Sequence, residues 1–250
     1  MADRMPGRTL LRRAVGHLSR RLERPELLAA FSRQVLQAEH EAVGIAAALA
    51  GVLRASSTYV DVGANRGQVL REAVRIAPGG RHVAFEPIPE LARELGERFP
   101  DVQCRTKALG AQPGRAEFCH FRELDGWSGL RRNPEITDER GRPEFIEVEI
   151  STLDMEMEGL SPAVVKVDVE GAELAVLEGG RRVLSEVRPM LLLEHVPSTA
   201  ELYGTSSSQL WALLDELDYA IFTATGAGPV SSAELPAFAH VVNWLARPQS

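Results

Sequence analysis

The chain lacks features that are typical of several classes of protein. It has only two cysteines, Cys104 and Cys119, which are too few for a disulfide framework and lack metal-site spacing. Its longest apolar run, residues 43–53, has 11 members, whereas a membrane-spanning helix needs roughly 20. Arginines interrupt the apolar stretches near the N-terminus, which argues against a signal peptide. We therefore expect a cytoplasmic protein without a transmembrane segment.

Positive charge is scarce outside one end of the chain. The 250 residues carry a net charge of −7, but residues 1–24 hold seven arginines and two acidic residues, so the remainder carries −12. A body with this charge is a poor binder of nucleic acid. The composition, 44% hydrophobic and 25% charged, is ordinary for a globular protein. We expect a small-molecule partner and no nucleic acid.

The first 54 residues differ in pattern from the rest of the chain and are expected to form an N-terminal helical extension, with the main domain over residues 55–250. Leu11, Val15, Leu18 and Leu22 fall on one helical face, and residues 25–54 indicate a second helix or a helix pair. A basic amphipathic helix can contact a membrane or a partner, or it can pack on the main domain with its arginines in solvent. Packing on the main domain is the favoured interpretation, and a homodimer formed through these helices is left open.

From residue 57 the sequence alternates between short β-rich runs and helical periodicity, which predicts βαβ units and a parallel sheet. Residues 115–154 interrupt this alternation with two segments that resemble an antiparallel hairpin around a polar loop, residues 123–143. The prediction is an α/β fold with about seven sheet strands and an inserted β-hairpin. The expected strands cover residues 58–62, 81–85, 102–109, 163–169, 190–196, 219–225 and 240–245, the hairpin residues 115–122 and 144–150, and the helices residues 67–77, 89–99, 172–185 and 206–217.

A glycine-rich loop comes after the first of these strands and opens a helix. Its pattern is D-x-G-x-x-x-G, with Asp61, Gly63 and Gly67, and differs from the dinucleotide pattern G-x-G-x-x-G. A carboxylate inside the turn suits a cationic amino group and repels a pyrophosphate. The loop therefore favours a nucleoside that carries an amino acid, S-adenosylmethionine (SAM), over NAD. The loop residues expected to contact the cofactor are Asp61, Gly63, Ala64, Asn65, Gly67 and Gln68.

An acidic residue ends the second strand at the spacing that a ribose needs. Glu86 lies 19 residues beyond Gly67 and is followed by Pro87. Dinucleotide folds place a ribose-binding acid about 20 residues after their glycines. The alternative is a structural turn with a surface glutamate. The adenine is expected against Ala108, near the end of the third strand, where many SAM enzymes have an acid that this sequence lacks.

Charged residues alternate with valines in a segment that otherwise indicates a central strand. Lys166, Asp168 and Glu170 share one face at a period of two, although central parallel strands are apolar on both faces. Buried charge is costly unless it is paired, and ligands bind at the carboxyl ends of such strands. A functional site is the favoured interpretation, and a structural Lys–Asp pair is the alternative. Asp168 is expected to face the cofactor.

The next strand ends in Glu194 and His195, and a free histidine can accept a hydroxyl proton near neutral pH. We expect both residues to contact the acceptor and His195 to be catalytic, the alternative being a structural histidine. The loop at 123–143 is expected to cover the acceptor, with Trp127 as an apolar wall and Ser128 beside it. An ordinary surface loop is the alternative.

These residues resemble the FkbM-type SAM-dependent methyltransferases. The matching pieces are DVGANRGQ at 61–68, FEP at 85–87, TLD at 152–154, VKVDVEGAE at 165–173 and LEH at 193–195. The resemblance covers roughly residues 57–245 and leaves residues 1–54 outside. It implies a class I methyltransferase (Rossmann-like) fold with a seven-stranded sheet whose last strand is antiparallel. It also implies O-methylation of hydroxyls on natural products, sugars, lipids or glycans, with S-adenosylhomocysteine as the product.

In the mechanism that we predict, His195 removes the acceptor proton, Asp168 faces the methionine part of SAM or orients the acceptor, and Lys166 neutralises neighbouring carboxylates. A Mg²⁺-assisted variant would use hard donors at Asp168, Glu170, Glu194 and His195, but Lys166 would compete with the cation, so no metal is favoured. An N-methyltransferase shares the same cofactor site and stays open. A NAD-dependent oxidoreductase is disfavoured because the dinucleotide pattern is absent and because Asp61 is present in the loop. The intact loop disfavours a non-enzymatic binding module.

Overall fold

The computed structural model describes residues 25–249 apart from residues 135 and 138–140. The helix expected around Leu11 and Leu22 lies outside these residues. The chain divides into two units, residues 1–43 and 44–250. Helix α2 (Pro25–Val52) is a single helix, which settles the alternative of a helix pair. None of the helices in the described part of the chain is long and apolar enough to cross a membrane.

The larger unit begins inside α2, earlier than the expected boundary after residue 54. The last turns of α2 belong to it because Leu49 and Leu53 are almost fully buried and pack in a core cluster with Tyr59. Gly44 also lies close to the backbone of Ala224, where an added Cβ would stand 2.1 Å from the carbonyl oxygen.

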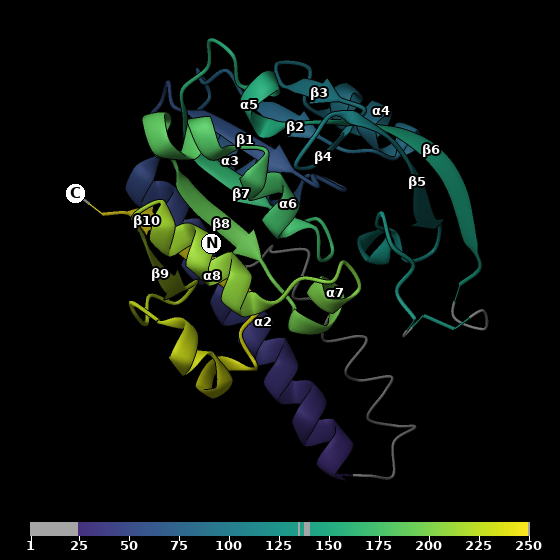
Figure 1. The fold of residues 1–250 in the computed structure, drawn as a ribbon, viewed down its shortest axis with the longest axis vertical. Coiled ribbons are helices and arrows are strands. Elements are labelled where there is room, and N and C mark those ends of the chain that lie inside the picture. The colour runs from purple at the N-terminus through teal and green to yellow at the C-terminus, as the bar shows by residue number, and fades with distance from the viewer. Residues whose placement is uncertain (1–24, 135, 138–140, 250) are drawn as a thin grey trace, which may run out of the picture. The chain divides into compact units, whose positions relative to one another are not determined.

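A seven-stranded sheet forms the centre of this unit (Figure 1). The strand order is β3-β2-β1-β7-β8-β10-β9, and β10 runs in the direction opposite to the other strands of this sheet. The seven strands and the antiparallel last strand of the prediction are confirmed. The strands are β1 (Thr58–Val62), β2 (Val83–Phe85), β3 (Gln103–Arg105), β7 (Pro162–Val167), β8 (Met190–Glu194), β9 (Tyr219–Thr223) and β10 (Asn243–Pro248).

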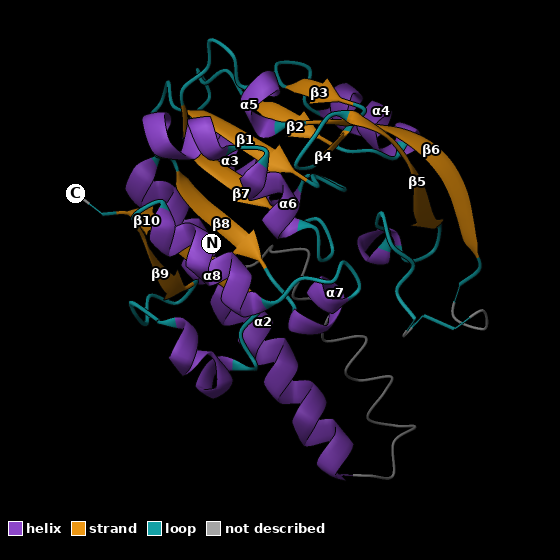
Figure 2. Ribbon diagram, viewed as in Figure 1, coloured by secondary structure: helices purple, strands orange, loops and turns teal. Residues whose placement is uncertain are grey.

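Helices cover both faces of the sheet, as Figure 2 shows. One core cluster joins the sheet to α6 and α8, and the other joins it to α3, α4 and the end of α2. Strand residues alternate between the two clusters, so Val60 and Val62 face one and Tyr59 the other. The helices are α3 (Gln68–Ile76), α4 (Pro89–Arg98), α5 (Leu153–Glu156), α6 (Glu173–Glu178), α7 (Pro197–Glu201) and α8 (Ser207–Glu216), with short turns η1 (Asp125–Trp127), η2 (Val183–Val187) and η3 (Ser232–Phe238).

The expected hairpin is present but belongs to a second sheet. Strands β5 (Gly114–Phe121) and β6 (Pro143–Ser151) pair antiparallel, and β4 (Ala108–Leu109) joins β6 in parallel. The single strand expected over residues 102–109 is therefore wrong. The chain leaves the main sheet after β3, and Lys107 between the two halves forms an ion pair with Glu149 of β6 at 2.8 Å.

The single helix expected over residues 172–185 is also interrupted. It stops at Glu178 because the next two glycines pack against other segments. A Cβ at Gly179 would stand 2.1 Å from the carbonyl oxygen of Gly110, and one at Gly180 would stand 2.7 Å from the Leu153 side chain. The chain then continues in the π-helical turn η2.

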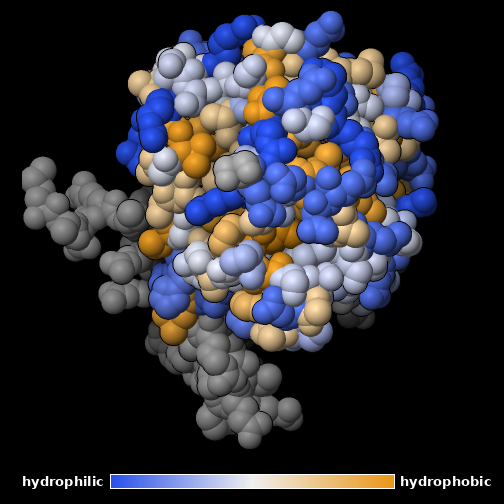
Figure 3. All heavy atoms as spheres, turned by 60° about the vertical axis from the view of Figure 1, so that its left-hand side comes forward, coloured by the Kyte–Doolittle hydropathy of each residue, from blue (hydrophilic) through white to orange (hydrophobic). Residues whose placement is uncertain are grey.

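The surface is mixed in character. On the face drawn in Figure 3, hydrophobic patches come to the surface between hydrophilic side chains. Two of the exposed large hydrophobic residues, Trp127 and Phe145, lie on the segment from β5 to β6. This inserted segment thus offers aromatic side chains to solvent or to a ligand.

Candidate active site

The glycine loop makes a tight turn between β1 and α3. Gly63 has a φ of +75°, and a Cβ there would stand 1.8 Å from the carbonyl oxygen of Asp168. Gly67 also has a positive φ, +67°, and lies against Leu95 and Phe99 of the α4 region. Only glycine tolerates both the conformation and the close contact at residue 63, so the loop needs this residue for steric reasons.

Glu86 lies directly against this loop, which brings together the two parts predicted to hold the cofactor. Its Oε2 accepts the N–H of Asn65 at 2.8 Å, and its Oε1 accepts the N–H of Ile88 at 2.9 Å. Burial raises the pKa of the Glu86 carboxyl to about 7, although the two backbone donors oppose the shift. Glu86 is therefore a positioned carboxyl group and not the surface glutamate of the alternative.

A buried lysine joins the two strands at the centre of the sheet. Lys166 Nζ lies 3.2 Å from Asp61 Oδ1 and 3.0 Å from Asp168 Oδ2, and it donates to the carbonyl oxygen of Gly63 at 3.0 Å. Burial alone would lower the pKa of the lysine, but Asp168 and Asp61 raise it above its usual value. The pairing of Lys166 with the two aspartates thus joins the strands, and the hydrogen bond from Lys166 to Gly63 also holds the loop.

Asp61 lies beneath the loop at 1% exposure and also accepts a hydrogen bond from the Tyr59 hydroxyl at 3.2 Å. Burial raises the pKa of Asp61, while Lys166 acts in the opposite direction. Its negative charge is therefore compensated within the protein. Direct contact between Asp61 and the ammonium group of a cofactor stays a prediction.

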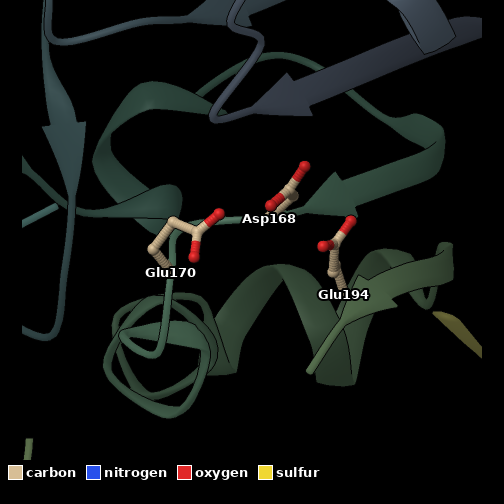
Figure 4. A group of neighbouring side chains, drawn as sticks. All are labelled: Asp168, Glu170 and Glu194. Atoms are coloured by element: carbon tan, nitrogen blue, oxygen red, sulfur yellow. The ribbon is translucent and has the colours of Figure 1, made fainter. Parts of the chain in front are cut away.

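Three carboxylates converge beyond the ends of β7 and β8 (Figure 4). Asp168, Glu170 and Glu194 each offer an oxygen atom, and these atoms lie within 4.8 Å of one another. Glu170 has a φ of +54°, which a residue with a side chain rarely adopts. Burial raises its pKa to about 9, and the charges of Asp168, Glu194 and Glu173 add to the shift. A strained backbone thus holds a proton-binding carboxyl against two others.

A cavity of about 260 Å³ opens beside these carboxylates. It contains two of the predicted acceptor contacts, Trp127 and Glu194, and also Glu170. Ser128 does not line it, because its hydroxyl accepts the N–H of Phe121 at 2.9 Å inside the inserted segment. Gly126 and Asn133, which also line it, lie in the loop expected to cover the acceptor, whereas no sequence pattern pointed to the remaining lining residues, Val196, Ser198 and Thr199.

His195 does not line this cavity, although both of its neighbours in the chain do, and it is 4% exposed. Its Nδ1 lies 3.4 Å from Glu173 Oε2, its Nε2 lies 2.8 Å from the Ser207 hydroxyl, and its ring packs on Trp211. Both ring nitrogens are thus engaged with protein groups. The catalytic role of His195 stays a prediction that this geometry does not support, and the buried network matches the structural alternative.

The other predicted cofactor contacts lie around the loop. Ala64 is buried and donates its N–H to the carbonyl oxygen of Phe85 at 3.0 Å, and Gln68 begins α3. Pro87 follows Glu86 between β2 and α4. Ala108 opens β4 of the second sheet at 9% exposure, so the adenine contact that we predict there would lie at the junction of the two sheets.

Comparison with known proteins places the chain in a family. A family model described as Methyltransferase FkbM domain matches residues 61–221, more than half of the chain. A search of curated protein sequences finds no match.

Solved structures with a similar arrangement include a methyltransferase FkbM from Methylobacillus flagellatus KT, with 20% identity and a TM-score of 0.49 over 79% of this chain and 45% of that chain. This chain therefore spans less than half the length of that relative. A precorrin-6y C5,15-methyltransferase from Geobacter metallireducens GS-15 has 15% identity and a TM-score of 0.45, over 84% and 87% of the two chains. A TehB-like SAM-dependent methyltransferase from Corynebacterium glutamicum has 10% identity and a TM-score of 0.46, over 90% and 97%. On the strength of the family match, the resemblance seen in the sequence is confirmed, and the chain belongs to the FkbM family of SAM-dependent methyltransferases.

Proposed function

We propose that the protein transfers the methyl group of SAM to a hydroxyl group of a small molecule, such as a natural product, a sugar or a lipid-linked glycan, and releases S-adenosylhomocysteine. One observation carries this proposal. The glycine loop, with Glu86 bound to it, is tied through Lys166 to Asp168, and Asp168 is one of the carboxylates beside the cavity. Three contacts thus link the loop that we propose for the donor to the carboxylates that we propose for the acceptor.

The residues of the loop fit an adenosyl amino acid. The close contact of Gly63 with the Asp168 backbone fixes the turn. Each Glu86 oxygen accepts one backbone N–H, which leaves acceptor capacity for ribose hydroxyls. The loop backbone at Ala64 and Asn65, together with Gln68, would surround the methionine part, and Pro87 and Ala108 would border the adenine. SAM, when bound, supplies a methyl group that its sulfonium already activates.

The residues beside the cavity would orient the acceptor and remove its proton. We assign the proton acceptor to Glu170, because its carboxyl lines the cavity. With a pKa of about 9 it holds a proton at neutral pH, so the base is its ionised fraction, which is strongly basic and grows as the pH rises. Asp168 and Glu194 raise its proton affinity, and Trp127 forms one wall. Glu170→Gln is expected to lower kcat by about 10²- to 10⁴-fold, the range of general-base catalysis, with SAM binding unchanged. A larger loss in His195→Ala than in Glu170→Gln would return the base to His195.

The cofactor assignment is tested by titration calorimetry with SAM, S-adenosylhomocysteine and NAD. We expect the two adenosyl ligands to bind, NAD not to bind, and Glu86→Gln to weaken SAM at least about tenfold, because a charged acceptor to two hydroxyls is lost. Glu90→Gln, a nearby change on the exposed side of α4, is the matched control. Tight NAD binding, or no adenosyl binding by the intact protein, would overturn the proposal. Methyl transfer to matched alcohol and amine acceptors, measured side by side, then distinguishes O-methylation from N-methylation.

A metal-assisted O-methyltransferase is the second candidate, favoured by the three carboxylates of Figure 4. Asp168, Glu170 and Glu194 would hold Mg²⁺ through hard oxygen atoms, and the cation would lower the pKa of an acceptor hydroxyl. Lys166 already neutralises Asp168, so a cation would have to compete with it. Activity that is lost in EDTA and restored by Mg²⁺ would select this candidate, and activity unchanged by EDTA would remove it.

The proposals on partners and location rest on the sequence. The charge of −12 outside residues 1–24 supports a small-molecule acceptor over nucleic acid. We also propose a cytoplasmic location, a helical extension over residues 1–54 whose last turns pack with the methyltransferase domain at 55–250, and a homodimer formed through that extension. Light scattering of the full chain and of a chain that lacks residues 1–24 measures their masses. The dimer proposal fails if both chains have the mass of one copy.

A further inference from the structure

An ion pair links the glycine loop to the inserted segment, two regions 59 residues apart in the sequence. Arg66 lies in the loop between Asn65 and Gly67, and its Nη2 donates to Asp125 Oδ2 at 2.5 Å. The Asp125 side chain is only 11% exposed, whereas that of Arg66 is 54% exposed. The carboxylate is therefore held in place while the guanidinium reaches it from the loop.

Both ends of this pair are anchored. On the loop side, the N–H of Asn65 is bound to Glu86, and the carbonyl oxygen of Arg66 accepts a hydrogen bond from Arg98 of α4. On the other side, Asp125 begins the turn η1, and its Oδ1 lies 3.5 Å from His120 Nε2 on β5. A movement of the loop backbone would thus be passed to η1 through the ion pair.

The turn η1 also carries part of the acceptor cavity. Gly126 and Trp127, the two residues after Asp125, line it. The Trp127 side chain stays 42% exposed, so this wall is open to solvent on one side. The ion pair therefore connects the segment that contacts Glu86 with the aromatic wall of the cavity.

We propose that Arg66 and Asp125 are positioning residues that couple binding in the adenosyl site to the placement of the Trp127 wall. The inference rests on the proposed function, since it needs an adenosyl ligand in the loop. A ligand that contacts the loop favours the loop conformation in which Arg66 reaches Asp125, and the pair then holds η1 against the cavity. Acceptor binding and adenosyl binding assist each other, because coupling between two sites is reciprocal.

A second acid near Arg66 provides a matched control. Glu94 Oε2 lies 3.7 Å from Arg66 Nη1, and both side chains are more than half exposed. Exposed pairs of this kind contribute little. Glu94→Gln therefore removes one ion-pair partner of Arg66 and leaves the turn η1 unchanged. Asp125→Asn removes the partner that connects Arg66 to η1 and the cavity wall.

The test measures how far solvent reaches the Trp127 side chain, and it needs no acceptor molecule. Trp211 and Trp244 are 3% and 2% exposed, so acrylamide quenching of the fluorescence reports on Trp127. We expect saturating S-adenosylhomocysteine to lower the quenching constant of the natural chain by about two- to threefold, and Trp127→Phe to lose this response. The Glu94→Gln chain should behave like the natural chain. Asp125→Asn should bind the ligand with an affinity within about five times that of the natural chain, the range of one surface ion pair, and show no protection.

The exchanged pair, Arg66→Asp with Asp125→Arg, should regain the protection, which a merely structural role for either residue would not produce. If Asp125→Asn does not fold, Arg66→Gln replaces it, because it breaks the same ion pair at its exposed residue, and it should likewise bind the ligand and show no protection. Protection that persists in Asp125→Asn or Arg66→Gln overturns the coupling while the proposed function stands. Failure of the natural chain to bind S-adenosylhomocysteine in calorimetry overturns the proposed function, and the coupling with it.

Discussion

Replacing Glu170 by glutamine should change how the stability of the protein depends on pH. The pKa of this carboxyl is raised from 4.5 to about 9 by burial and by neighbouring carboxylates. Between these two values the folded chain keeps a proton that the unfolded chain releases, so this group makes folding less favourable as pH rises. Below pH 4.5 both states are protonated and the effect disappears. Glutamine has a similar shape and no titration.

The size of the effect comes from the linkage relation. A proton kept only in the folded state changes the free energy of unfolding by about 1.4 kcal/mol per pH unit. From pH 5 to pH 8 the ceiling is therefore about 4 kcal/mol, and solvent around the partly buried carboxyl reduces it to about 2–4 kcal/mol. The Glu170→Gln chain should become more stable than the natural chain by this amount as the pH rises over that interval.

Urea unfolding at pH 5, 6, 7 and 8, without ligand, measures the difference directly. Glu158→Gln, at an exposed glutamate, is the control and should run parallel to the natural chain. If Glu170→Gln and the natural chain differ by the same free energy at pH 5 and at pH 8, Glu170 does not hold a proton at neutral pH. The raised pKa of Glu170, and with it the strong basicity assigned to its ionised form, would then be refuted.

Two further substitutions test the loop and the strands beneath it. Lys166→Met leaves Asp61 and Asp168 without their shared cation and should destabilise the chain by about 3–5 kcal/mol in urea unfolding at pH 7; a loss below about 1 kcal/mol would refute the pairing. Gly63→Ala puts a Cβ 1.8 Å from a backbone oxygen at a φ of +75° and should weaken S-adenosylhomocysteine at least about tenfold in calorimetry. Gly51→Ala, whose Cβ meets open space in α2, should keep full binding and gain up to about 1 kcal/mol of stability; equal binding in both alanine variants would contradict the steric argument.

The sequence predicted that Glu86 and the glycine loop lie together, because their signals are local. A β-rich run, two glycines at a fixed spacing and a strand-terminal Glu86 specify a turn and an acid at the same sheet edge. Lys166 was also foreseeable, since a charge on a central strand must be paired, and Asp61 lies opposite it in the register of β1 and β7.

The residues that line the cavity were harder to predict, because lining depends on which way a side chain faces at a strand end. Glu194 is the last residue of β8 and His195 follows it, so period two predicts that their side chains turn to opposite sides of the sheet. Leu193 belongs to the core cluster that contains Trp211, and His195 points from the same face into it. The alternation was visible in the sequence, but which face held the cavity was not.

Long-range features lay beyond sequence patterns altogether. Residues 102–109 have β composition throughout, and nothing local shows that the chain changes sheets between β3 and β4. The contact of Arg66 with Asp125 likewise joins two polar loops with no shared periodicity. Such contacts arise from tertiary packing, which overrides local propensity.

The burial of Lys166 gives the chain an unusual property toward amine-directed reagents. The protein has only two lysines, and the side chain of Lys166 is 9% exposed while that of Lys107 is 30% exposed. Of the two lysines, a dye or a resin that reacts with primary amines under native conditions would therefore modify Lys107 and leave Lys166 unmodified. The protein can thus be tethered or labelled by common ester chemistry without loss of the ionic link between β1 and β7.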